Sequence, residues 1–204
     1  MQVRPAADPE VQFDPGGIRR GREGRSAALR MTMTTQPEVW LRGAVPGVDP
    51  LLQPAAHALL QTVEDVERAL DGLSADQIWA SPGGAASIGF HVRHLAGSTD
   101  RLFTYARGER LNDAQRARLA AEKDPAGVDA ASLLDDLRAG IEAALQHLRD
   151  TPASSLLEPR AVGRAALPTT VLGLLVHAGE HAQRHAGQIT TTSRIVRRLN
   201  ARHG

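Results

Sequence analysis

Three histidines at four-residue spacing, His177, His181 and His185, lie near the C-terminal end of the chain, and a second pair, His91 and His94, lies far upstream. Residues four apart on an α-helix lie about 40° apart around its axis, so one helix face presents several imidazoles together. Imidazole is a preferred protein ligand for zinc and similar metals, and this chain has no cysteine to compete for that role. The spacing therefore predicts a metal site between helices.

The three downstream histidines lie on a predicted helix that begins after Pro168. Its apolar stripe consists of Val171, Leu174, Leu175, Ala178, Ala182 and Ile189. On a helical wheel, His185 lies within about 40° of the core direction, His181 at about 80° and His177 at about 120°. His181 and His185 therefore flank the core, where another helix can supply a third ligand. His177 is better explained as a boundary histidine in a hydrogen bond.

The upstream pair lies on a second predicted helix, from Ile88 to about Ala106, for which Ser87 is a suitable N-cap. Its buried stripe consists of Ile88, Val92, Leu95, Leu102, Phe103 and Ala106. The wheel places His91 nearer this stripe than His94, so periodicity alone favours His91 as the third ligand by a small margin. Among the other histidines, His57 lies beside the stripe of the first predicted helix, and His147 and His203 are predicted to be solvated.

Several known metal-enzyme signatures can be tested against these residues. The string HAGEH over residues 177–181 matches the H-x-x-E-H signature of inverted zinc peptidases, with Glu180 as the base. Such sites also need an acidic ligand further along, and no Asp or Glu follows residue 180. The H-E-x-x-H order and the E-x-x-H pairs of di-iron bundles are absent as well. These classes of site are therefore excluded.

Four amphipathic segments with helical periodicity must position these histidines. They extend from about residue 50 to 73, from 88 to 106, from 129 to 149, and onward from residue 168. No strand-like alternation appears among them. We therefore predict an all-α protein, a four-helix bundle over residues 46–195 with a long connection between helices 2 and 3. Residues 196–204 are predicted to form a basic C-terminal tail with a solvated face.

The first part of the chain differs in composition. It is rich in Pro, Gly and Arg and has neither a sustained apolar period nor the apolar stretch of a secretory signal. We predict that residues 1–45 form a disordered extension, and that Met31 or Met33 is the native translation start.

Composition excludes several classes of function. The absence of cysteine excludes disulfides, thiolate metal sites and a cysteine nucleophile, and it fits a cytoplasmic location. A formal net charge of +1 gives no global field that would recruit nucleic acid. The longest apolar run, Val171 to Val176, is too short to span a bilayer. All but one of the 24 basic residues are arginine, which indicates a GC-rich bacterial genome.

Taken together, these residues resemble the DinB/YfiT-like family of metal-binding four-helix bundles. The string SIGFHVRHLAGSTDRLFTY (87–105) is similar to the family's second helix, and HAGEHAQRHAGQI (177–189) to its H-x3-H-x-G-Q signature. LSADQIWASPGG (73–84) is similar to its link between the first two helices. The likeness covers about residues 50–195.

The resemblance implies a specific set of ligands. The family's three metal-binding histidines fall on His94, His181 and His185, which favours His94 over the His91 that the wheel prefers. His91 then becomes a neighbouring or substitute ligand, and His57 and His177 are additional to the family pattern. Gly187 and Gln188 match the family's G-Q, where we expect close packing and a helix-stabilising hydrogen bond.

Three neutral imidazoles leave at least one coordination position open on zinc or nickel, or on iron, as in catalytic sites. A water at that position would lose its proton near neutral pH, or a substrate thiolate would replace it. The resemblance implies both chemistries, because the family includes thiol-dependent transferases and isomerases. We therefore expect a cytoplasmic metalloenzyme for hydrolysis or thiol transfer on a small molecule, with Glu180 or His91 as the candidate general base.

Two alternatives remain open. In the first, the protein is a stress-associated helical bundle in which a structural metal joins two helices. In the second, it is a metal-free interaction bundle whose histidines are ordinary polar groups. As partners we expect a small-molecule substrate, such as a low-molecular-weight thiol, with no nucleic acid and no membrane, and the resemblance implies a homodimer.

Overall fold

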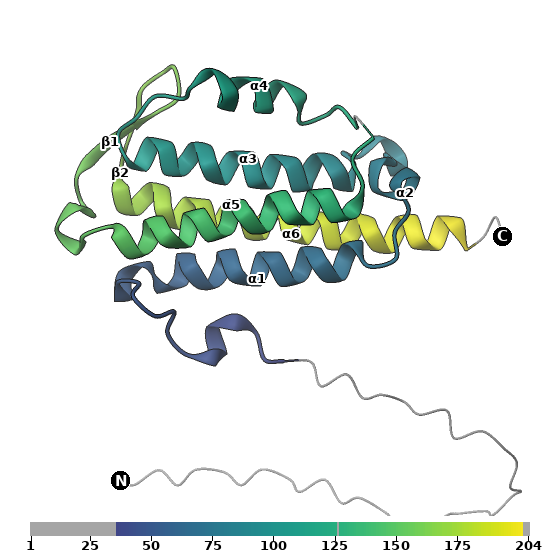
Figure 1. Cartoon of the computed structure of the whole chain (residues 1–204), viewed down its shortest axis with the longest axis horizontal. Coiled ribbons are helices and arrows are strands. Elements are labelled where there is room, and N and C mark those ends of the chain that lie inside the picture. Colours follow the sequence, from purple (N-terminus) through teal and green to yellow (C-terminus); the bar gives the residue numbers. More distant parts are fainter. Residues whose placement is uncertain (1–35, 126, 202–204) are drawn as a thin grey trace, which may run out of the picture. The chain divides into compact units, whose positions relative to one another are not determined.

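A computed structural model describes residues 36–125 and 127–201; the segment before residue 36, with Met31 and Met33, and His203 lie outside these ranges. The described part is mostly helical, as the periodicity predicts. Its four long helices are α1 (Gln53–Leu70), α3 (Ile88–Ala106), α5 (Ala130–Asp150) and α6 (Val171–Asn200), shown in Figure 1. Helices α1 and α3 each pack against both α5 and α6, so the four surround one core.

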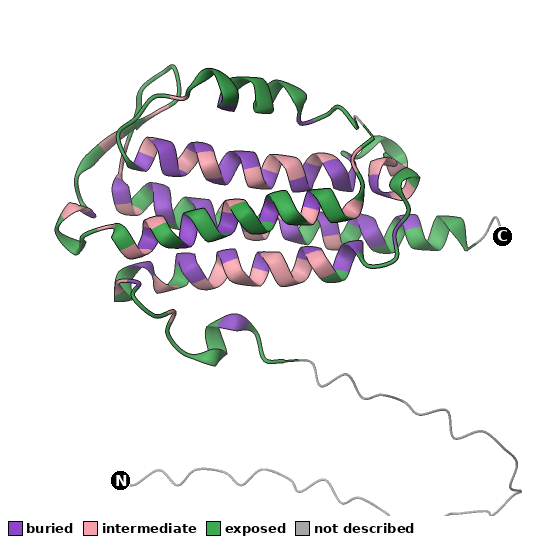
Figure 2. Ribbon diagram, viewed as in Figure 1, coloured by how far each residue is buried: buried purple, intermediate pink, exposed green. Residues whose placement is uncertain are grey.

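The core consists of aliphatic side chains on the facing sides of the four helices, which Figure 2 shows as buried stripes. Its largest fully buried members include Leu59, Leu70, Ile88, Leu95, Leu137, Leu148, Leu175 and Ile189. Helices α1 and α6 approach closely at Gly179, where an added Cβ would lie 3.1 Å from the Cα of Ala55. This close approach places one side of α6 on α1, while His181 and His185 contact histidines of α3.

The helices begin where the sequence supplies a capping side chain. The Ser87 hydroxyl accepts a hydrogen bond from the backbone N–H of Phe90 at 3.1 Å, so the predicted cap of α3 is confirmed. Asp129 caps α5 and Thr170 caps α6 in the same way. Each cap satisfies one N–H that the first helical turn leaves without a partner.

The connections between the long helices contain further elements. Short helices α2 (Ala75–Trp79) and α4 (Asp113–Ala121) follow α1 and α3, and strands β1 (Pro159–Val162) and β2 (Leu167–Thr170) form an antiparallel hairpin before α6. The 3-10 turns are Val39–Arg42, Pro50–Leu52, Pro82–Gly84 and Ala153–Ser155. The sequence prediction included neither α4, which is mostly exposed, nor the hairpin, which is half exposed, because both carry little apolar periodicity.

Helix α4 is attached along one side of α3. Its Gln115 side chain donates to Asp100 Oδ2 at 2.9 Å and to Thr104 Oγ1 at 2.7 Å. The carbonyl oxygen of Ala121, at its other end, accepts from the Arg93 guanidinium at 2.9 Å. The long connection therefore lies over α3 rather than away from it.

Two segments beyond the predicted 46–195 boundaries contact the helices. The backbone N–H of Val39 donates to Gln61 of α1 at 2.9 Å. At the other end, α6 continues to Asn200, and Arg197 donates to the carbonyl oxygen of Ala69 at 3.1 Å. Over the residues described, no helix combines the length and the apolar character that crossing a membrane requires.

Candidate metal centre

Three of the predicted histidines meet between α3 and α6. His94 projects from α3, and His181 and His185 project from successive turns of α6, with one ring nitrogen from each within 4.8 Å of the others. His94 Nε2 and His181 Nε2 are 3.1 Å apart. Two nitrogens bound to one tetrahedral zinc at about 2.0–2.1 Å lie about 3.3 Å apart, so the observed spacing is close to that of a bound pair.

A buried carboxylate orients His94. Glu122, which directly follows α4, accepts a hydrogen bond from His94 Nδ1 at 2.7 Å. Because an ionised carboxylate can only accept, a proton is on Nδ1, and Nε2 is the nitrogen that faces His181. A carboxylate that holds the outer nitrogen of a histidine in this way is typical of metal-ligating imidazoles.

Glu122 is itself held by a buried arginine. Its Oε1 accepts from Arg101 Nη1 at 2.8 Å, and both residues are less than a tenth exposed. Burial alone would raise the pKa of Glu122, but the hydrogen bonds from His94 and Arg101 outweigh it and hold this pKa below its usual value. The carboxylate is therefore ionised at neutral pH, as its role towards His94 requires.

Gly97 makes room for this ion pair. A Cβ at residue 97 would lie 2.8 Å from Arg101 Nη1 and 2.9 Å from Glu122 Oε1, closer than side-chain atoms approach. Sequence reasoning missed Glu122 because it lies in the connection between helices. The available signal was Arg101, a charge on the buried side of α3 that needs an acidic partner.

His91 lies beside the cluster rather than in it. It is 7% exposed, and its Nδ1 is 3.0 Å from His185 Nδ1, so a hydrogen bond between the two rings leaves His185 Nε2 for another partner. The residue that the helical wheel prefers thus contacts a member of the cluster, whereas His94, implied by the resemblance, belongs to the cluster.

Two of the clustered histidines and their neighbour His91 are held neutral. Burial, followed by the nearby charged forms of the other histidines, lowers the pKa of both His181 and His185 to about 4. Burial also lowers the pKa of His91. At neutral pH these rings therefore carry no charge and present lone pairs, the form in which histidine binds a metal.

Glu180 and His177 lie on the exposed side of α6. The Glu180 carboxylate accepts from His177 Nδ1 at 3.0 Å and from the Arg184 guanidinium, and about half of its side chain is exposed. Both of its oxygens are thus engaged away from His94. His177 has the hydrogen bond that the sequence analysis expects of a boundary histidine.

The remaining histidines and the G-Q pair lie away from the cluster. His57 Nε2 is 2.9 Å from the carbonyl oxygen of Gly43. His147 is half-buried with its ring against Phe103, so the prediction that it is solvated is wrong. The expected close packing at Gly187 is also wrong, because a Cβ there would meet nothing within 4 Å. Gln188 is exposed and has no hydrogen bond from its side chain to any described residue.

Comparisons with known proteins find relatives at the level of the family and of the fold. The sequence model described as the DinB superfamily matches residues 27–189. Among solved structures, the crystal structure of a conserved protein from Enterococcus faecalis is similar, with a TM-score of 0.58 and 19% sequence identity, and covers 71% of this chain and 95% of that chain. At this identity the likeness concerns the fold alone. No curated protein matches the chain.

Proposed function

The chain belongs to the DinB superfamily, and we propose that it is a metalloprotein of the DinB/YfiT type, a four-helix bundle in which His94, His181 and His185 bind one divalent metal. The observation that carries this proposal is the convergence of three imidazole nitrogens within 4.8 Å, one of them oriented by a buried carboxylate. Three imidazoles at this spacing, one with a carboxylate on its outer nitrogen, match the arrangement of metal-ligating histidines.

The donor set favours zinc or nickel, with iron as a third choice. Imidazole suits these metals, whereas magnesium and calcium prefer oxygen ligands. With three protein ligands, the metal would supply a Lewis-acidic centre with an open coordination position. The residues of the chain would hold the ligands in place: Glu122 keeps the proton of His94 on Nδ1, and His91 fixes the ring of His185.

An open position supports catalysis on a small molecule, and we propose hydrolysis or thiol transfer as the reaction. His91 is the better placed of the two candidate bases, because its ring lies against the cluster while both Glu180 oxygens are engaged elsewhere. We also expect a cytoplasmic homodimer, with a low-molecular-weight thiol as one substrate; these remain predictions.

A structural metal is the second candidate function. His94 and His181 are 87 residues apart in the sequence and belong to neighbouring helices, so a shared metal would join α3 to α6. In that case a chelator would lower the melting temperature strongly, and no exogenous ligand would bind the metal. A catalytic metal would instead bind added thiols or anions at its open position.

The first experiment is to measure the metal content of the untagged protein by mass spectrometry. We expect about one zinc, nickel or iron per chain, which is lost in the His181→Ala, His185→Ala double variant. His177→Ala is the matched control, because it removes an imidazole one turn away that forms its hydrogen bond with Glu180. Absence of metal from the wild-type protein, together with a melting temperature that added zinc does not change, would refute the proposal.

A further inference from the structure

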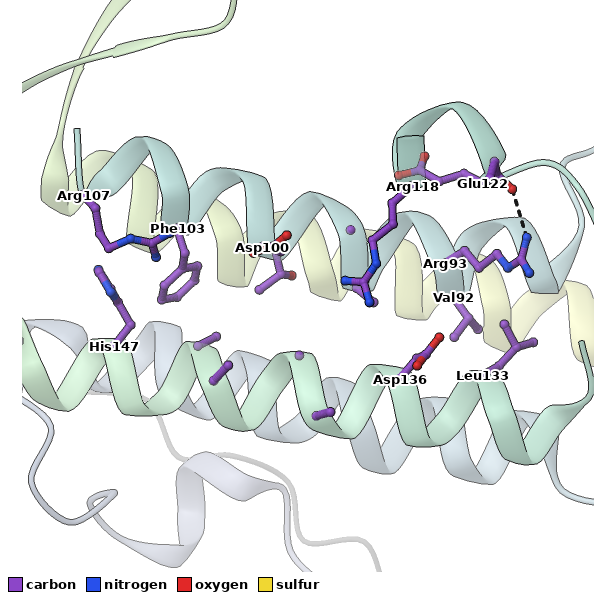
Figure 3. Close-up of a pocket in the computed structure, with 18 residues that line it drawn as sticks. Val92, Arg93, Asp100, Phe103, Arg107, Arg118, Glu122, Leu133, Asp136 and His147 are labelled. Carbon is purple, nitrogen blue, oxygen red and sulfur yellow. Dashed lines mark hydrogen bonds between the residues drawn. The ribbon is translucent and has the colours of Figure 1, made fainter. Parts of the chain in front are cut away.

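A cavity lies between α3, α4 and α5, and none of the three clustered histidines lines it. It has a volume of about 480 Å³, within the range of small-molecule sites. Figure 3 shows this cleft between the α3 and α5 ribbons, with side chains entering from both helices and from α4. Its floor is formed by small residues, Ala96, Gly97, Ala139, Gly140, Ala143 and Ala144.

One glycine of this floor, Gly140, is not required by the packing of α5 against α3. Gly140 lies inside α5, where glycine is less favourable than alanine. A Cβ at residue 140 would meet Ala96 Cβ at 4.0 Å as its nearest atom, which is ordinary van der Waals contact. Neighbouring side chains thus do not demand glycine at this position, and its effect is to keep the space above α5 open.

Three charged side chains line this space with polar atoms that no described residue engages. Within residues 36–125 and 127–201, neither Arg118 nor Asp136 forms a hydrogen bond or an ion pair from its side chain. Asp100 uses Oδ2 to accept from Gln115, and its other oxygen accepts no hydrogen bond from the residues in these two ranges. In Figure 3, Arg118 reaches from α4 into the gap between α3 and α5, where Asp100 and Asp136 project from the two sides.

The other charged residues around the cleft are already engaged. Arg93 donates to the carbonyl oxygens of Ala121 and Asp124, and Arg107 donates to Glu109 at 2.9 Å. Glu122 is held by His94 and Arg101. The groups left to contact a ligand are therefore one guanidinium and two carboxylates above an apolar floor that ends at the buried ring of Phe103.

We propose that the cleft binds a zwitterionic small molecule, with its anionic group on Arg118, its ammonium group on Asp136 and Asp100, and its apolar part on the alanine and glycine floor. A purely anionic ligand would be repelled by two carboxylates, and a purely cationic one by Arg118. A ligand with both charges satisfies both kinds of group. It would lie next to Glu122, the residue that the cleft shares with the histidine cluster.

The test uses the dipeptide alanyl-leucine as the probe, titrated into the full chain and followed by calorimetry and by backbone amide spectra. We expect saturable binding at one site, with the largest shifts at Ala96, Gly140 and Ala143. N-acetyl-alanyl-leucine lacks the ammonium group and alanyl-leucine amide lacks the carboxylate, so both should bind more weakly. No saturable binding of the dipeptide up to about 10 mM, a very weak affinity, overturns the proposal.

Two variants remove the charges singly. Arg118→Gln is expected to weaken dipeptide binding about tenfold or more but to leave binding of the amide nearly unchanged. Asp136→Asn should weaken the dipeptide but not its N-acetyl form. The matched controls are Arg116→Gln and Asp135→Asn, neighbours on the same helices that lie outside the cleft and form their own surface ion pairs. Equal affinities in variants and controls would overturn the proposal.

A third variant blocks the space without changing charge. Ala143→Leu places a larger side chain on an exposed floor position, so it should abolish binding while the helical circular dichroism remains. The His181→Ala, His185→Ala double variant should bind the dipeptide as the wild type does, whether or not metal is present. Loss of dipeptide binding in this double variant, with its fold intact, would place the ligand on the histidines and overturn a separate site.

Discussion

The two sides of α3 are built from opposite kinds of side chain. Toward α6, imidazole rings gather in one cluster, with centroids 4.7 Å apart for His94 and His185 and 4.5 Å apart for His181 and His185. Toward α5 and α4, alanine and glycine leave a cleft of about 480 Å³. One helix thus supports a preorganised cluster on one side and an open space on the other.

The two sites also differ in how the helix that faces α3 is held in place, which is α6 at the histidine cluster and α4 at the cleft. Helix α6 is fixed by its close contact with α1 at Gly179. Helix α4, by contrast, is held over the cleft mainly by side-chain hydrogen bonds to α3, and α5 does not close the space beneath it. The histidine cluster therefore depends on helix packing, and the cleft depends on polar bonds that a solvent-exposed helix can exchange for water.

The largest loss of stability should come from replacing Glu122, the residue that the two sites share. Glu122→Ala leaves the buried Arg101 guanidinium without its carboxylate, and we expect a loss of about 3–5 kcal/mol in the free energy of unfolding. Urea denaturation measures this loss. The control is Glu109→Ala, which removes an exposed ion pair with Arg107 and should cost about 1 kcal/mol or less. Equal losses in the two variants would contradict the central role of Glu122.

Zinc addition tests whether the histidine cluster between α3 and α6 is a metal site or only a packed interface. For a metal that binds the folded chain alone, free zinc at 100 times its Kd should stabilise the protein by about 2.7 kcal/mol. Thermal unfolding of metal-free protein with and without zinc measures this gain. His185→Ala should abolish it and His177→Ala should retain it, because only His185 belongs to the cluster. The same gain in both variants would locate the zinc elsewhere.

A pair of glycine substitutions tests the difference in packing directly. Gly97→Ala should destabilise the chain by about 1–3 kcal/mol, because its Cβ would collide with the Arg101–Glu122 pair. Gly140→Ala should instead stabilise it by up to about 1 kcal/mol, because alanine favours the helix more than glycine does and its Cβ would not collide with any neighbour. Chemical denaturation of both variants gives the two signs. A stabilising Gly97→Ala would show that the ion pair can move aside.

The smallest effect concerns His147 at the end of the cleft. Burial, followed by the charge of Arg107, lowers the pKa of His147 in the folded protein. As the pH falls below about 6.5, the unfolded chain gains a proton at this histidine before the folded one does, so stability decreases. His147→Leu should remove this part of the pH dependence, seen as a shallower decrease in unfolding free energy than in the wild type. An unchanged slope would show that His147 titrates equally in both states.

Much of the helical framework was predictable from local patterns. Apolar periodicity located α1, α3, α5 and α6, and Ser87 identified the start of α3, because both signals are contained within a single helix. The four-residue spacing selected His181 and His185 for the same reason. Helix α4 was not predicted because hydrogen bonds from Gln115, rather than an apolar face, attach it to α3.

The details of the site depend on tertiary contacts that periodicity does not contain. The helical wheel favours His91 because it measures the direction of the core, whereas α6 meets the flank of α3 where His94 lies. Glu122 and the cleft depend on where α4 crosses α3. Arg101 was the one local indication, since a buried guanidinium needs an anion from somewhere else in the chain.

The contact between α1 and α6 also has a consequence for the order of assembly. The Gln183 side chain donates to the carbonyl oxygen of Ala58, 125 residues earlier in the chain, at 2.8 Å. Contacts this distant in sequence close late, after the loop between them is ordered. During synthesis, α1, α3 and α5 leave the ribosome before α6, so the parts of α1 and α3 that pack on α6 stay uncovered until α6 follows. The histidine cluster can form only when α6 docks on α3, because the two helices share its ligands.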